Sequence, residues 1–265
     1  MLELFIIKAL IIGSLLGIST GILGNFLVAS RQSMMSDMIA HTSLFGVGVG
    51  VFIGLSPVVF GILIGIASAL VLFYLSFKKK SPADAIAVMI LTTGLALAIL
   101  LSHMSSLNGF NLENYLFGSI LTITNSEAYI IGGLCLLISL SMWIVRKKLF
   151  KAIVDRNFMI SQNQKALHYE LFFLICVGVL ISSSLKVIGG LLISALLVIP
   201  VLTSYNFNKR FQDGLILASL INVCCVCIGL AASYYFDVPT SSSIVLSLSS
   251  LYLLSLIFNK ILKKI

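Results

Sequence analysis

The chain consists of long apolar runs that short polar clusters interrupt. Windows without Asp, Glu, Lys or Arg cover residues 9–30, 42–77, 85–112, 128–145, 171–185, 187–208, 214–236 and 238–259. A helix needs about 20 mainly apolar residues to cross the hydrocarbon of a bilayer, and most of these windows hold one. The window 42–77 is interrupted at Leu55-Ser56-Pro57, so it holds the outer parts of two spans. The pattern predicts an all-α polytopic membrane protein, a single transmembrane domain over 1–265 with about eight to nine transmembrane helices.

Each expected span lies between two of these polar clusters. The spans are 5–29, about 35–54, 57–77, 83–104, 127–145, 170–185, 187–206, 213–236 and 243–259. The segment 170–185 is short for a crossing, which suggests a broken or re-entrant element there.

Composition excludes several classes of protein. Hydrophobic residues make up 59% of the chain and charged residues only 10%, and the mean hydropathy is +1.14, so there is too little charge to cover a soluble globule. No Lys follows a Gly, which excludes a phosphate-binding P-loop. No hydrophilic block is long enough for a catalytic or nucleotide-binding domain. We therefore expect no enzyme activity, no permanently bound cofactor and no nucleic-acid partner.

The basic residues orient the spans. Of the 17 Lys and Arg, 15 lie at Arg31, at Lys78 to Lys80, within Arg146 to Lys165, at Lys209-Arg210 and at Lys260 to Lys264. The first four places occupy every second link and the fifth follows the last span on the same side, and basic segments face the cytoplasm. The net charge of +8 is thus explained by topology. The expectation is a multi-pass protein of the cytoplasmic (inner) membrane, in contact with lipid, with its N-terminus outside and its C-terminus inside.

Asp37 and His41 are ionisable residues inside the second span. Four residues apart, they share one helix face with Cβ atoms roughly 6 Å apart, so a carboxylate oxygen and an imidazole nitrogen can reach one divalent cation. Ionisable groups within a membrane are functional candidates by default. The alternatives are a buried ion pair and a carboxylate at a helix start.

Other polar residues in or near the spans have simpler roles. Asp84 follows Ser81-Pro82 and is typical of a helix N-terminus, and His103 lies at the outer end of the same span, where it is either solvated or an entry ligand. Asp237 ends the eighth span on the outside and either lines an external mouth or caps a helix. The five cysteines lie in apolar spans, as expected for small buried hydrophobes without disulfides.

The longest hydrophilic stretch, 146–170, is expected on the cytoplasmic side. It is long enough for a short surface helix that contacts a partner, and a solvated loop is the alternative. Its polar residues are Asp155, Arg156, Asn157, Gln162, Asn163, Gln164 and Lys165, after Arg146-Lys147-Lys148.

Four segments carry a family resemblance. They are Gly24 to His41 (GNFLVASRQSMMSDMIAH), Tyr115 to Leu121 (YLFGSIL), Gly189 to Pro200 (GGLLISALLVIP), and Asp237-Val238-Pro239 followed by Ser243-Ile244-Val245-Leu246. In this order, across nearly the whole chain, they resemble the metal-uptake ABC transporter permeases, particularly the zinc permease subunit. Met159 and Asn163 depart from the family's usual Ala and Gly.

The resemblance implies a permease that forms a homodimer, is driven by a separate cytoplasmic ATP-binding subunit and receives Zn²⁺ or Mn²⁺ from an extracytoplasmic metal-binding protein. It makes Asp37 and His41 the expected ligands of the transported metal, with Asp237 as an acid by the external mouth, and it places a coupling helix around Asp155 to Gln164. From the residues alone, manganese or iron import, an ion-coupled secondary transporter and a purely structural membrane subunit stay open as alternatives.

Overall fold

The structure is a computed structural model that describes residues 2–79, 82–104, 112–118, 124–154, 159, 166–207 and 210–262. The helices are α1 (Leu2–Ala29), α2 (Met34–Ile53), α3 (Pro57–Lys79), α4 (Ala83–Met104), α5 (Leu112–Phe117), α6 (Asn125–Val154), α8 (Ala166–Ile188), α9 (Gly190–Phe207), α10 (Phe211–Phe236) and α11 (Thr240–Leu262). Within the described part of the chain, nine helices, all except α5, are long and apolar enough to cross a membrane. The predicted all-α polytopic fold is confirmed.

Two expectations about individual spans are changed by the structure. The segment 170–185 is no broken element, because α8 is one helix of 23 residues. Glu170 and Lys186 bound the apolar window but lie inside the helix, near its ends, where charged side chains reach the membrane interface. Helix α6 continues to Val154, so the hydrophilic stretch 146–170 begins and ends in helix.

The chain divides into two compact units. Unit 1 comprises Met1–Val28, Ser119–Trp143 and Leu192–Ile265, and unit 2 comprises Ala29–Gly118 and Ile144–Leu191. Helices α6 and α9 therefore each contribute to both units.

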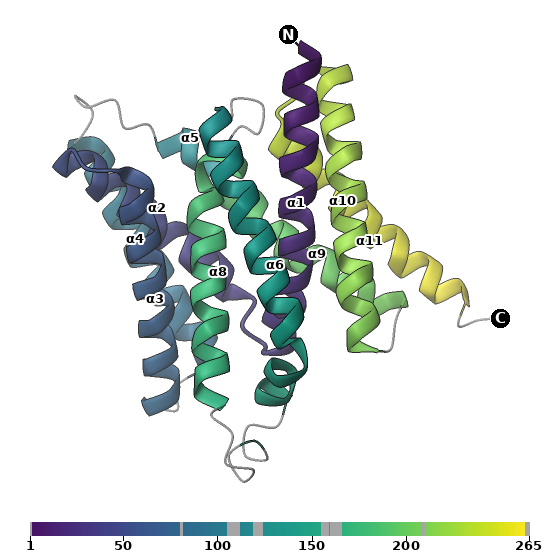
Figure 1. Ribbon diagram of the computed structural model, residues 1–265, viewed down its shortest axis with the longest axis horizontal. Helices are drawn as coiled ribbons and strands as arrows, with labels where there is room; N and C mark the ends of the chain where they lie inside the picture. Colours follow the sequence, from purple (N-terminus) through teal and green to yellow (C-terminus); the bar gives the residue numbers. More distant parts are fainter. Residues whose placement is uncertain are drawn as a thin grey trace. The chain divides into compact units, whose positions relative to one another are not determined.

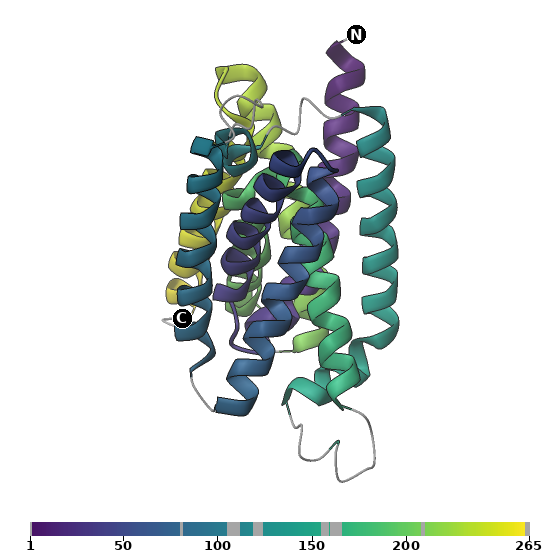
Figure 2. The same ribbon diagram turned by 90° about the vertical axis from the view of Figure 1, so that its left-hand side faces the viewer.

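In unit 2, α2 packs against α3 and α4, and α3 packs against α8 (Figure 2). Glycines allow this close approach. A Cβ atom at Gly46 of α2 would lie 2.5 Å from the main-chain oxygen of Phe60, and one at Gly94 of α4 would lie 2.7 Å from the methyl group of Thr42. Small residues let helix backbones approach each other in lipid.

In unit 1, α1 lies beside α10 (Figure 1). Gly13, Gly17 and Gly21 of α1 face, in that order, Val226, Asn222 and Ser219 of α10, so the two helices run antiparallel. A Cβ atom at Gly21 would lie 2.6 Å from the Cα atom of Ser219. Gly13, Gly17 and Gly21 thus form a seam along which α1 packs on α10.

Several polar side chains lie inside these units within the apolar core, and many large apolar side chains lie on the outside. Asn25, Asn222, Ser43 and Thr203 are fully buried, whereas Leu246 is 68% exposed. Because lipid is as apolar as a protein core, exposed leucines cost little there and buried polar groups join helices instead.

Candidate functional site

Asp37 and His41 lie in the first two turns of α2. The chain turns at Arg31, which has a left-handed φ of 56°, and α2 then begins with Met35 N–H donating to the oxygen of Gln32 (2.9 Å). The Ser36 hydroxyl donates to the oxygen of Ser33 (2.8 Å). Asp37 belongs to the first turn, so the structure is also compatible with a helix-start carboxylate, where the helix dipole favours negative charge.

His41 presents a buried nitrogen without a hydrogen-bond partner. Its side chain is half-buried, and within the described residues its Nδ1 atom makes no hydrogen bond. Such an atom in a native structure calls for an explanation, such as water or an ion that binds it. One helical turn from the Asp37 carboxylate, it can serve as a ligand for a cation.

The turn that follows His41 is fixed to two neighbouring helices. The hydroxyl groups of Thr42 and Ser68 of α3 are 2.8 Å apart, and those of Ser43 and Ser182 of α8 are 2.7 Å apart. These four side chains are buried. They hold this part of α2 on α3 and α8, which fixes the helix face that carries the candidate ligands.

Two segments of the family resemblance meet in unit 2. Gly118 (φ 58°) and Gly189 (φ 86°) are both left-handed, and their backbones touch: a Cβ atom at Gly118 would lie 2.8 Å from the oxygen of Ile188. A Cβ atom at Gly190 would lie 3.6 Å from that of Ala40. The start of α9 therefore lies next to the residue that precedes His41.

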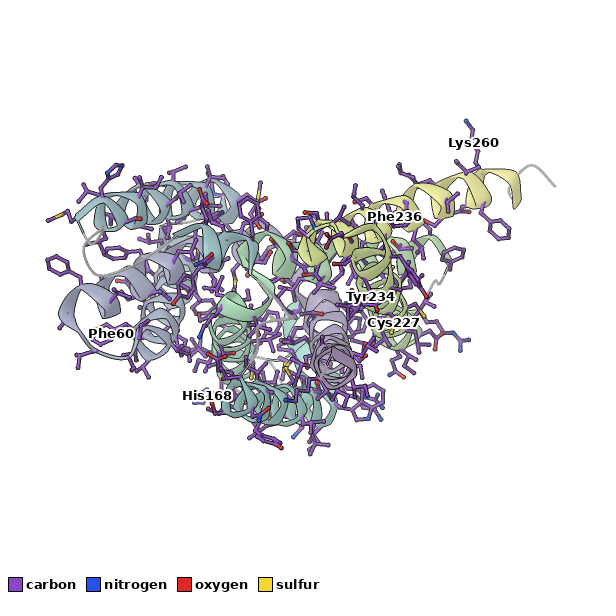
Figure 3. The ribbon with its side chains drawn as sticks, turned by 90° about the horizontal axis from the view of Figure 1, so that it is seen from above. Phe60, His168, Cys227, Tyr234, Phe236 and Lys260 are labelled. Atoms are coloured by element: carbon purple, nitrogen blue, oxygen red, sulfur yellow. The ribbon has the colours of Figure 1, made fainter. Side chains whose placement is uncertain are left out.

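Asp237 lies in unit 1, at the C-terminal end of α10. It is the C-cap residue, with φ 53° and ψ 40°, and the Ser233 hydroxyl donates to the oxygen of Val238 (2.6 Å). Tyr234 and Phe236, 60% and 77% exposed, precede it (Figure 3), and exposed aromatic residues are typical of the membrane interface. Asp237 thus caps the end of α10 through its backbone, and its place at an external mouth stays a prediction.

Asp84 and His103 are exposed at opposite ends of α4. Among the residues that the structure describes, no group of three or more His, Cys, Asp and Glu side chains could hold a metal ion. Asp37 and His41 are thus a pair of candidate ligands, fewer than the four that zinc prefers in structural sites.

The residues expected to contact an ATP-binding partner lie outside the described residues: Asp155, Arg156, Asn157, Gln162, Asn163 and Gln164. Their surroundings are described. Met159, for which the resemblance implies the family's usual Ala, is fully buried in a cluster with Ala152 and Ala166. The Lys148 ammonium lies 5.9 Å from the centre of the Tyr169 ring, a cation–π distance.

A cavity of about 220 Å³ opens beside this cluster. Its walls come from the chain before α2 (Ser30, Gln32), the end of α3 (Phe73, Ser76), and the facing turns of α6 and α8 (Ala152, Glu170). The sequence carries no signal for it, because its lining comes from four separate segments.

All five cysteines are free, as expected. Cys135, Cys176 and Cys225 are buried, whereas Cys224 is exposed, so the expectation of burial was wrong for Cys224. It faces outward from α10, where lipid accepts an apolar thiol.

Comparisons with known proteins agree along nearly the whole chain. Residues 3–259 match the ABC 3 transport family. The high-affinity zinc uptake system membrane protein ZnuB of Buchnera aphidicola is 29% identical over 245 residues, which cover 92% of this chain and 93% of that protein. The manganese import system permease protein ScaB of Streptococcus gordonii is 26% identical over 251 residues, 95% of this chain and 90% of that protein.

A solved structure shares the fold. The structure titled "PsaBC from Streptococcus pneumoniae in complex with Fab" matches with a TM-score of 0.83 and 28% identity, over 95% of this chain and 90% of that chain. The chain therefore belongs to the ABC 3 transport family, which confirms its predicted membership of the metal-uptake ABC transporter permeases.

Proposed function

We propose that this chain carries a divalent metal, with zinc as its substrate, inward across the cytoplasmic membrane by alternating access, and that Asp37 and His41 bind the metal on its way. The observation that carries this proposal is the buried His41 Nδ1 atom, which makes no hydrogen bond within the described residues although it lies in a membrane-spanning helix. Polar atoms in that position are costly unless they bind something.

Zinc is the preferred substrate because an imidazole with a carboxylate suits it. Manganese and iron are the alternatives, since the same ligand types also bind them and affinity alone does not decide which metal is taken up. The relatives divide in the same way, because one is named for zinc uptake and another for manganese import.

The energy comes from a separate cytoplasmic ATP-binding subunit, since the chain has no phosphate-binding loop. The permease acts as a homodimer, and an extracytoplasmic metal-binding protein delivers the metal to its outer face near Asp237. The N-terminus lies outside and the C-terminus inside. This topology is supported by the helix order, because four of the five basic clusters fall in every second link between spans and the fifth lies at the C-terminal end, on the same side.

The ATP-binding subunit contacts the segment from Asp155 to Gln164. The cavity beside Ala152 and Glu170 lies, in this topology, at the cytoplasmic end of α6 and α8. Met159, which lies within this stretch, is buried against Ala152 of α6 and Ala166 of α8.

The test is uptake of radioactive zinc and manganese by cells that express the chain with the ATPase encoded next to it. We expect Asp37→Ala and His41→Ala to lower ATP-dependent zinc uptake more than tenfold at normal membrane levels, which corresponds to about 1.4 kcal/mol or more. Asp84→Ala is the matched control for Asp37→Ala, since the same residue type is exposed there, and it should keep normal uptake.

Each other outcome has a definite meaning. Retention of uptake by both site variants would remove Asp37 and His41 from the metal path. Uptake that continues without the ATPase would favour an ion-coupled secondary transporter, in which the same pair relays protons. ATP hydrolysis by the purified chain alone would contradict the assignment of that activity to a partner.

A further inference from the structure

Helix α9 contains a proline in its interior. Pro200 lies ten residues after the start of the helix, and proline has no N–H group to donate to the carbonyl four residues earlier. That carbonyl belongs to Leu196, whose side chain is 1% exposed. A buried carbonyl without a donor is destabilising, so the missing main-chain hydrogen bond requires a substitute donor.

The substitute is the side chain of Asn222. Its Nδ2 atom donates to the oxygen of Leu196 at 2.9 Å, from a side chain that is fully buried on α10. The same nitrogen lies 3.0 Å from the oxygen of Gly17 and 3.1 Å from the hydroxyl oxygen of Thr20, both on α1. One amide group thus joins α1, α9 and α10 within unit 1.

The three acceptors do not depend on Asn222 equally. The Gly17 carbonyl has the N–H of Gly21 four residues later in an unbroken helix, and the Thr20 hydroxyl already donates to Leu16 at 2.7 Å. Only the Leu196 carbonyl has lost its helical donor, because residue 200 is proline. The two hydrogens of the Asn222 Nδ2 atom cannot bond fully to three acceptors. Of the three, the Leu196 oxygen is the one for which no main-chain N–H of its own helix is available.

We propose that Asn222 is a positioning residue that supplies the hydrogen bond which Pro200 withholds from Leu196, and so fixes helix α9 against α1 and α10 for transport. Leu196 and Pro200 belong to the segment 189–200 that resembles the permease family. The transport part of this inference rests on the proposed function, and the structural part does not.

Asn25 offers a matched control. It is also a fully buried asparagine, it also joins α1 to α10, through Nδ2 donating to the oxygens of Gly21 (2.7 Å) and Gly214 (3.2 Å), and its Oδ1 atom, like that of Asn222, makes no hydrogen bond within the described residues. Neither of its acceptors precedes a proline by four residues. The two asparagines therefore differ in the one feature on which the proposal depends.

The experiment is a double-mutant cycle on the full-length chain in mild detergent. The measured quantity is the temperature at which half of the protein is no longer monodisperse. We expect Asn222→Ala to lower this temperature by about 3–6 °C, the shift typical of one lost buried hydrogen bond or two in a chain of this size. In the Pro200→Ala background, where the substituted residue provides the missing N–H, the shift should fall to less than half. Asn25→Ala should cause the same shift in both backgrounds.

Hydrogen exchange provides a second readout, which does not need Pro200→Ala to fold. Asn222→Ala should speed amide exchange in the α9 segment that follows Leu196, and Asn25→Ala should not. In cells, Asn222→Ala should lower metal uptake severalfold at normal membrane levels, and Pro200→Ala should restore part of it.

An additive cycle, in which Asn222→Ala costs as much in the Pro200→Ala background as in the unsubstituted chain, would overturn the proposal, as would unchanged exchange in α9. Uptake that is normal in Asn222→Ala would refute the transport part alone. Absence of uptake in the unsubstituted chain would refute the proposed function and leave the cycle in place.

Discussion

The contact between Gly118 and Gly189 provides the sharpest test of the packing in unit 2. Both residues are left-handed, with φ 58° and 86°, a conformation that costs an L-residue with a side chain roughly 1–2 kcal/mol. Both also face main chain. A Cβ atom at Gly118 would lie 2.8 Å from the oxygen of Ile188, and one at Gly189 would lie 2.6 Å from the oxygen of Leu116. Main-chain atoms cannot rotate away, so overpacking adds roughly 1–3 kcal/mol.

Gly118→Ala and Gly189→Ala should therefore each lower the free energy of unfolding by about 2–5 kcal/mol. Gly54 separates the two contributions. It is also left-handed, with φ 77°, but no atom of the described residues lies within 4 Å of the position of its Cβ atom, so Gly54→Ala should cost only the conformational part, about 1–2 kcal/mol.

The assay is the thermal midpoint of the full-length chain in detergent, at about 3 °C per kcal/mol for a chain of this length. We expect a fall of about 3–6 °C for Gly54→Ala and of about 6–15 °C for Gly118→Ala. Equal losses at the two positions would show that the segments around residues 118 and 189 are not in contact, and would refute the reasoning.

The other predictions concern α1, α10 and the thiols. Gly24→Ala should disrupt the packing of α1 on α9, because its Cβ atom would lie 2.9 Å from the main-chain carbon of Leu197. Gly133→Ala, with open space around it among the described residues, should instead stabilise the chain by up to about 1 kcal/mol. Thermal midpoints of the two variants compare these effects, and equal midpoints would contradict the packing of α1 on α9. Asp237→Asn should keep the thermal midpoint, since Asn tolerates φ 53°. It should lower metal uptake, because we propose that the metal enters near this carboxylate; unchanged uptake would show that Asp237 only caps α10. Because all five cysteines are free, a reducing agent should leave uptake unchanged, and a loss of uptake would indicate a disulfide between chains.

Local features were predictable because the membrane imposes them one segment at a time. A span needs a fixed length of apolar residues, so charge-free windows locate the helices, and the break at Leu55-Ser56-Pro57 separates α2 from α3 as expected. Because residues 37–41 were expected to be helical, the four-residue spacing of Asp37 and His41 was enough to place them on one helix face. The misjudged span, α8, shows the limit of counting charges, because Glu170 and Lys186 are compatible with helix at a membrane surface.

The pairing of distant segments was not predictable. These helices are apolar on all sides, so no periodic polar stripe tells which face meets protein and which meets lipid. Gly118 and Gly189 touch although they are far apart in sequence, and the serine pair at 43 and 182 joins two helices that nothing local connects.

Residues a few positions apart, together with the thickness of a bilayer, were thus enough to define the class of the protein, the approximate ends of its spans and the spacing of its candidate metal ligands. Tertiary packing was needed to bury the His41 nitrogen without a partner among the described residues, and to bring Asn222 to the hydrogen bond that Pro200 leaves open. Both features depend on which helix faces meet. In an apolar solvent, close packing and a few buried hydrogen bonds select those faces, and their partners lie far apart along the chain.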